Sequence, residues 1–120
     1  MKKVLVVEDD FPLRTSIKEI LKLNDIDVLV ASEGGEAWEL LQKHTVDLVI
    51  TDLAMAGKDG IWLIQQIKQN KPEIKYIVIS GDIKCQKALM EAKNFDASSI
   101  FAKPFDFEEF VEVVTGLIED

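Results

Sequence analysis

The chain has 120 residues, with 22 acidic and 14 basic side chains and a net charge of −8. This balance argues against a protein that binds the nucleic-acid backbone, because that function needs a basic patch. No stretch approaches the ~18 apolar residues of a membrane span. The length fits one domain, residues 1–120, and the single cysteine excludes an internal disulfide. We therefore expect a cytoplasmic protein, since the first residues do not resemble a signal peptide.

The first part of the chain predicts two strand–helix units. The apolar run 4–7 predicts a strand, and a helix follows with Pro12 in its first turn and an end at Asn24–Asp25. Run 26–31 alternates only partly, which favours a strand near the edge of a sheet. Ser32 fits the N-cap of the next helix or the approach to it. That helix is marked by Ala37, Trp38, Leu40 and Leu41.

The rest of the chain predicts three more units of the same kind. Strands are expected at 46–52, 76–79 and 99–102, and the helix after the first of these stops before Pro72. Leu48, Val49 and Ile50 form a continuous apolar run, which is typical of a strand buried on both faces. The three helices are marked by Ile61, Leu63, Ile64 and Ile67; by Ala88, Leu89 and Ala92; and by Phe107, Phe110, Val111, Val114 and Leu117.

Five alternating strand–helix units predict an α/β fold. The expected structure is a five-stranded parallel sheet with right-handed crossovers and five helices on both faces. Its strand order would be 2-1-3-4-5, the doubly wound, flavodoxin-like arrangement. That order brings Glu8 and Asp9, at the end of the first strand, beside Asp52 at the end of the third. Ser80 and Lys103 end the fourth and fifth strands and lie at the same edge.

These strand-end residues predict a site for phosphoryl chemistry. Several carboxylates at one point repel each other, and a hard divalent cation such as Mg²⁺ (or Mn²⁺) relieves the repulsion. A solvated acidic loop would be the ordinary explanation for any single acid here. Lys103 adds a positive charge and Ser80 a hydroxyl, and together with the acids they could surround a transferring phosphoryl group. Aspartate can itself be the nucleophile and form an acyl phosphate.

The chain resembles a response-regulator receiver domain of two-component signalling along its whole length. The resemblance rests on five segments that occur in order: Val6–Asp10, Asp47–Asp52, Met55–Gly60, Ile79–Gly81 and Phe101–Phe105. Each segment alone is weak, but all five at strand ends are highly specific. The resemblance implies a phosphorylation-dependent switch, with no turnover of a diffusible substrate beyond its own phosphotransfer and dephosphorylation.

The resemblance also implies a role for each acid. Asp52 matches the phosphoacceptor, which takes its phosphoryl group from a phosphohistidine of a sensor histidine kinase or phosphotransfer protein. Asp9 matches a direct metal ligand and Glu8 a ligand that acts through water. The backbone carbonyl of Ala54 matches a further ligand. A downstream output domain or protein would read the resulting change in conformation.

Further roles follow from the resemblance at the other strand ends. Ser80 matches a switch hydroxyl and Lys103 a phosphate-pairing lysine, whose bond to Pro104 is expected to be cis. The family has a switch aromatic where this chain has Ile100, and isoleucine cannot rotate as an aromatic ring does. The family often has glycine at Asp96, where aspartate would have to tolerate a left-handed backbone.

Two neighbouring positions are expected to set the lifetime of the phosphoryl group. Ala54 is small and leaves room for water, and Asp82 adds negative charge near the entrance. The surface expected to bind the kinase or a phosphotransfer helix bundle comprises Phe11, Leu13, Arg14 and Phe105.

Two alternatives remain open at this stage. A receiver that has lost phosphorylation could act as a phosphate-independent interaction module, and Ile100 is the feature that supports this reading. A flavodoxin-like redox carrier shares the topology, since fold does not fix function. The second alternative is disfavoured, because acids follow the first strand where a flavin phosphate would need hydroxyl groups and glycines.

Overall fold

The computed structural model describes residues 2–53 and 57–119. Within these residues, five parallel strands form one sheet in the order β2-β1-β3-β4-β5. The strands are β1 (Lys3–Val7), β2 (Asp27–Ala31), β3 (Leu48–Asp52), β4 (Lys75–Ser80) and β5 (Ser99–Ala102). The predicted strand order is confirmed, and β2 is an edge strand as its partial alternation indicated.

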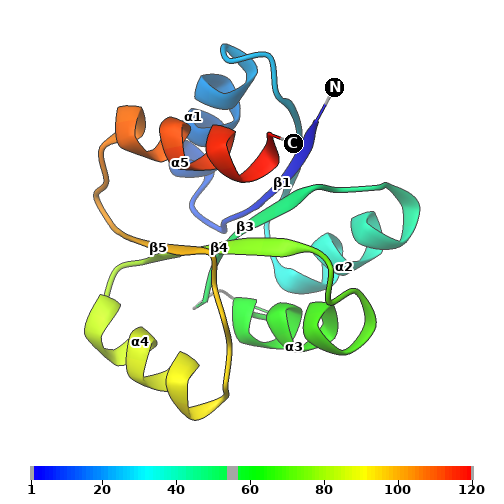
Figure 1. The fold of residues 1–120 in the computed structure, drawn as a ribbon, viewed down its shortest axis with the longest axis vertical. Helices are drawn as coiled ribbons and strands as arrows, with labels where there is room; N and C mark the ends of the chain where they lie inside the picture. The colour runs from blue at the N-terminus through cyan, green and yellow to red at the C-terminus, as the bar shows by residue number, and fades with distance from the viewer. Residues whose placement is uncertain (1, 54–56, 120) are drawn as a thin grey trace.

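Helices cover both faces of the sheet, as predicted. They are α1 (Phe11–Lys22), α2 (Gly34–Lys43), α3 (Gly60–Asn70), α4 (Ile83–Ala92) and α5 (Phe107–Ile118). Helices α1 and α5 lie on one face, and α2, α3 and α4 lie on the other (Figure 1). Within the described ranges, none of the helices combines the length and the hydrophobicity that a bilayer span requires.

The sheet separates two hydrophobic clusters, one on each face. Every residue of the central strand β3 is therefore buried. On one face, Ile17 and Leu21 of α1 pack with Phe110 of α5 against the sheet. On the other face, Leu63 and Ile64 of α3 lie in the second cluster. This two-sided burial is the physical reason for the continuous apolar run of β3.

Three local features refine or correct the expectations from sequence. The N-cap of α2 is Glu33, so Ser32 is the approach residue. Among the residues of α4 whose burial is described, Met90 is the buried one, whereas Ala88 and Ala92, both expected on its apolar stripe, are exposed. The left-handed residue before β5 is Asn94, at φ 58°, and not Asp96. Asparagine tolerates this conformation because its short side chain can hydrogen-bond locally.

Candidate functional site

The register of the sheet brings the acids together. Val7 of β1 lies opposite Thr51 of β3, so Glu8 and Asp52, each the next residue, leave the two strands side by side. Strand pairing is parallel, and both carboxyl ends therefore open at the same edge of the sheet. The juxtaposition follows from backbone register and not from any attraction between the acids, which repel each other.

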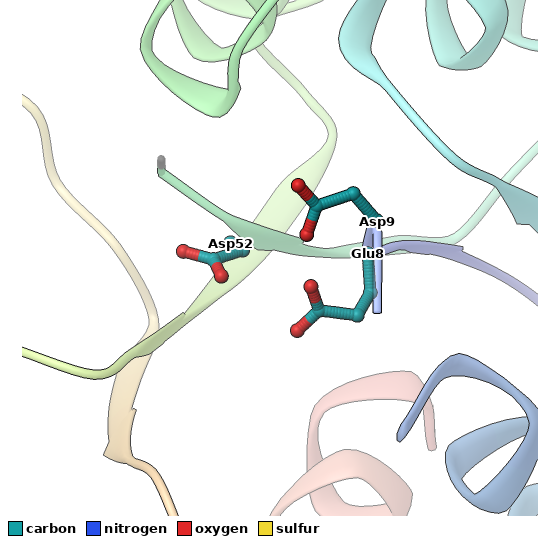
Figure 2. A group of neighbouring side chains, drawn as sticks. All are labelled: Glu8, Asp9 and Asp52. Carbon is teal, nitrogen blue, oxygen red and sulfur yellow. The ribbon is translucent and has the colours of Figure 1, made fainter. Parts of the chain in front are cut away.

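Glu8, Asp9 and Asp52 form a cluster in which one carboxylate oxygen from each lies within 4.8 Å of the others. Figure 2 shows the three carboxyl groups extending to the same side of the two strand ends. Glu8 is 0% exposed and Asp52 is 6% exposed, while Asp9 is exposed. The cluster thus combines two desolvated carboxylates with one that faces solvent.

Lys103 supplies the positive charge of this site. Its Nζ donates a hydrogen bond to Asp52 Oδ2 at 2.6 Å and lies 2.5 Å from Glu8 Oε1. The Lys103 side chain is only 24% exposed, so both ion pairs form in a largely dry environment. In the described structure, the lysine acts as counter-ion to both buried carboxylates.

Burial and charge oppose each other in the pKa values of this pair. Burial raises the pKa of Glu8 above its usual value, although Lys103 acts to lower it. Burial acts to lower the pKa of Lys103, but its contacts with Asp52 and Glu8 outweigh burial and raise the pKa overall. The lysine is therefore charged at neutral pH, and Glu8 is the carboxylate whose ionisation is opposed by its surroundings.

Ser80 ends β4 next to this pair. Its side chain is fully buried, and its hydroxyl oxygen accepts a hydrogen bond from the Asp82 N–H at 3.0 Å. The Lys103 N–H donates to the Ser80 carbonyl at 2.7 Å. These contacts join the ends of β4 and β5, so the predicted hydroxyl and the predicted lysine lie at one edge, as expected from the topology.

Three further residues hold the acidic strand ends, and the sequence pattern did not reveal two of them. The Arg14 guanidinium donates to the Glu8 carbonyl at 2.7 Å. The Thr51 hydroxyl, fully buried, donates to the Asp52 carbonyl at 2.8 Å.

Asp10 is the N-cap of α1, where its side chain accepts the Leu13 N–H. An aspartate two residues before Pro12 is a readable cap signal, and this role explains why Asp10 lies outside the cluster of Glu8, Asp9 and Asp52.

Gly60, the first residue of α3, packs directly on the main chain of Asp52. A Cβ at Gly60 would lie 1.9 Å from the Asp52 carbonyl oxygen, so only glycine fits. The Gly60 N–H also donates to the Leu53 carbonyl at 3.0 Å. The start of α3 therefore packs against Asp52, the candidate phosphoacceptor at the end of β3.

The remaining predicted residues divide into two groups. Ala54, proposed as a carbonyl ligand and as a tuning position, lies outside the described residues. Ile100 is half-buried on β5 and packs against the α2–α3–α4 side of the sheet. The Lys103–Pro104 bond is cis, as the resemblance implied.

The donor set fits a hard divalent cation. Mg²⁺ prefers carboxylate oxygens and keeps several of its waters, and three carboxylates with one facing solvent offer both conditions. Glu8 Oε1 is buried and, within the described residues, has no hydrogen-bond partner of good geometry beyond its ion pair with Lys103. This buried oxygen is therefore balanced by the charge of Lys103 and not by a well-formed hydrogen bond.

Comparison with known proteins agrees with this site. The response regulator receiver domain family matches residues 4–115. The chain is 29% identical to sporulation initiation phosphotransferase F of Bacillus subtilis, over 94% of this chain and 90% of that protein. It is 32% identical to the regulatory protein VirG of Agrobacterium tumefaciens over 92% of this chain, but spans only 41% of that protein.

A solved structure of similar fold is that of the response regulator TrrA from Thermotoga maritima in complex with Mg(2+)-BeF. It superposes with a TM-score of 0.86 at 30% sequence identity, and the match covers 98% of this chain and 99% of that one. The family match extends over nearly all of the chain and includes the strand ends that carry the acidic cluster and Lys103. The chain therefore belongs to the response regulator receiver domain family of two-component signalling.

Proposed function

We propose that residues 1–120 act as a receiver domain that accepts a phosphoryl group on Asp52 with the help of Mg²⁺ or Mn²⁺. The observation that carries this proposal is the convergence of three carboxylates and one ammonium at a single edge of the sheet. TrrA, whose match covers 98% of this chain, was solved in complex with Mg(2+)-BeF, which supports the proposal that this chain also takes a metal and a phosphoryl group.

Asp52 is the nucleophile in this proposal. One carboxylate oxygen forms a bond to phosphorus while the nitrogen–phosphorus bond of a phosphohistidine breaks, and the imidazole leaves with its electron pair. Glu8 and Asp9, with Asp52 and the Ala54 carbonyl, are the groups that would hold the ion. The bound ion would neutralise charge on the phosphoryl oxygens. Lys103 would pair with the same oxygens, so its ion pair with Asp52 must loosen as the acyl phosphate forms.

Ser80 would translate phosphorylation into a change of conformation. In the described structure its hydroxyl oxygen accepts a hydrogen bond from the Asp82 N–H at 3.0 Å. The Ser80 O–H would donate a hydrogen bond to a phosphoryl oxygen, and rotation of the side chain toward that oxygen would move the hydroxyl away from the Asp82 N–H. The two states therefore differ in specific contacts, as a ligand-driven shift requires. Ile100 replaces a switch aromatic, so the readout must rest on the loop and helix that follow Ser80.

The proposed partners are a sensor histidine kinase or phosphotransfer protein and a downstream output domain or protein. The proposed location is the cytoplasm. Phe11 is 66% exposed on the surface beside the site. The Arg14 guanidinium carbon lies 5.3 Å from the centre of the Phe11 ring. An exposed aromatic ring is a common anchor in protein interfaces. We expect this surface to receive the kinase or the phosphotransfer protein.

The test is phosphorylation by acetyl phosphate, followed by intact-protein mass spectrometry. The parent protein should gain one phosphoryl group in the presence of Mg²⁺ and none in the presence of a chelator. Asp52→Asn should remove the gain, and Asp27→Asn, which removes a charge at the start of β2 and at the far end of the sheet from the acidic cluster, should retain it. A parent protein without any mass gain would favour the phosphate-independent interaction module instead.

A further inference from the structure

The Glu33 carboxylate joins two loops that are far apart in the sequence. Its Oε1 accepts the Glu36 N–H at 2.6 Å, which caps α2. Its Oε2 accepts the Lys58 N–H at 3.2 Å, across 25 residues of sequence. The neighbouring Gly34 N–H donates back to the Lys58 carbonyl at 2.5 Å. We call these three residues, Glu33, Gly34 and Lys58, the loop clasp.

Three glycines line the clasp closely: Gly34 faces main-chain atoms of the other loop, and Gly35 and Gly57 face the Glu33 carboxylate. A Cβ at Gly57 would lie 2.5 Å from Glu33 Oε2, and the backbone there has φ 73°, which favours glycine. A Cβ at Gly34 would lie 2.7 Å from the Lys58 carbonyl oxygen. A Cβ at Gly35 would lie 2.6 Å from Glu33 Oε1. The close approach of the two loops therefore depends on the glycines, and the carboxylate fills the space between them.

The clasp connects directly to the main chain of Asp52. Residues 57–59, which it holds, lead into Gly60, and Gly60 packs so closely on Asp52 that a Cβ there would lie 1.9 Å from the Asp52 carbonyl oxygen. Asp59 fixes the start of α3 by accepting the Trp62 N–H at 2.9 Å. The Gly60 N–H bond to the Leu53 carbonyl completes the connection. A displacement of the clasp would thus press on or release the end of β3.

We propose that Glu33 is a positioning residue for the acidic site, an inference that rests on the proposed function. It touches neither the ion nor the phosphoryl group. It sets the placement of Asp52 by holding residues 57–59 against the start of α2. Loss of the clasp should weaken Mg²⁺ binding and slow phosphorylation while the sheet and its helices remain folded.

Serine and alanine at position 33 separate positioning from helix capping. Serine is a good N-cap but is too short to reach Lys58, whereas alanine neither caps nor reaches. Glu33→Gln keeps one oxygen acceptor, so it can serve only one of the two N–H groups and should lie between parent and Glu33→Ser. Glu39→Ser removes the same charge from an exposed position of the same helix and is the matched control.

The measurements are the Mg²⁺ dissociation constant by calorimetry, the initial rate of phosphorylation by acetyl phosphate, and urea unfolding. Glu33→Ser should unfold at nearly the parent's urea midpoint but raise the dissociation constant about threefold to tenfold, below the roughly 10–100-fold loss typical of direct neighbours of metal ligands. Glu39→Ser should match the parent. A Glu33→Ser protein with the parent's Mg²⁺ affinity would overturn the inference, whereas a parent that binds no Mg²⁺ would overturn the proposed function itself.

A double-mutant cycle provides a second, independent test. Gly57→Ala adds a methyl group against Glu33 Oε2, so it should weaken Mg²⁺ binding in the parent. In the Glu33→Ser background the methyl group has space, and only the backbone strain at φ 73° remains. The effect of Gly57→Ala should therefore be several-fold smaller there. Additive effects would show that the two positions do not act through one contact, and would contradict the inference.

Discussion

Replacement of Lys103 by methionine should destabilise the metal-free protein, because Lys103 neutralises two buried carboxylates at once. Its Nζ lies 2.5 Å from Glu8 Oε1 and 2.6 Å from Asp52 Oδ2. Methionine keeps much of the side-chain volume, so the change isolates the charge. Removing one partner of a buried ion pair costs about 3–5 kcal/mol. Since the Lys103 side chain is 24% exposed, we expect the lower end, about 3 kcal/mol.

The size of the effect is easily measured. For 120 residues the entropy of unfolding is roughly 0.25 kcal/mol/K, so about 3 kcal/mol corresponds to a fall of roughly 12 °C in Tm. Urea unfolding followed by tryptophan fluorescence, at pH 8 without Mg²⁺, gives the free energy directly. Lys87→Met, which removes a charge from an exposed position of α4, is the control and should change stability little.

The pH dependence of the penalty follows from Glu8. Its folded-state pKa is raised, so the folded protein favours the protonated carboxyl. The stability that protonated Glu8 contributes is fully present below the pKa that Glu8 has in the unfolded chain. It is lost as pH rises through the pKa that Glu8 has in the folded protein. Lys103 stays charged across this range, because its own pKa is also raised. The penalty of the substitution should therefore be largest at pH 8 and smaller in mild acid, where Glu8 accepts a proton.

Mg²⁺ should restore part of the lost stability. A ligand at about 100 times its dissociation constant stabilises the folded state by roughly 2.7 kcal/mol. Without the competing ammonium, the gain should be larger in Lys103→Met than in the parent. An unfolding free energy within about 0.5 kcal/mol of the parent at pH 8, the usual range for surface substitutions, would refute the view that Lys103 compensates buried charge.

Further predictions concern substitutions at four other positions. Tyr76, the only tyrosine, accepts the Asp96 N–H at 2.8 Å, and burial raises its pKa above 10.0. Absorbance titration should therefore show that Tyr76 ionises above pH 10.0 in the folded protein. The stability that the neutral phenol contributes should be lost as pH rises through this folded-state pKa. Tyr76→Phe should cost about 1 kcal/mol in urea unfolding by leaving that N–H unpaired; no loss would contradict the hydrogen bond. Phe110→Ala, at a fully buried ring, should cost about 3–5 kcal/mol, and a loss under half of that would indicate a loosely packed α5. Ala54→Arg and Asp82→Ala should each change the half-life of the acyl phosphate without abolishing phosphorylation; an unchanged half-life for Ala54→Arg would count against the tuning role.

The sequence alone determined the sheet and the position of its chemistry. Alternation of apolar strands and amphipathic helices permits few topologies, and parallel strands place their carboxyl ends at one edge. Glu8, Asp52, Ser80 and Lys103 could therefore be assigned to one site before any coordinates. Each sits at a strand end, where a break in the apolar pattern is easy to recognise.

Only the tertiary structure decided how that edge is held in place. The contact of Glu33 with Lys58 spans two loops, and the hydrogen bond from Arg14 to the Glu8 carbonyl joins a helix to a strand end. Local periodicity reports which face of an element is buried, but not which side chain reaches a neighbouring loop. The same limit explains why Met90 in α4 and the left-handed Asn94 were missed. Those choices depend on how the crossovers pack, and packing is decided by contacts between segments distant in the chain.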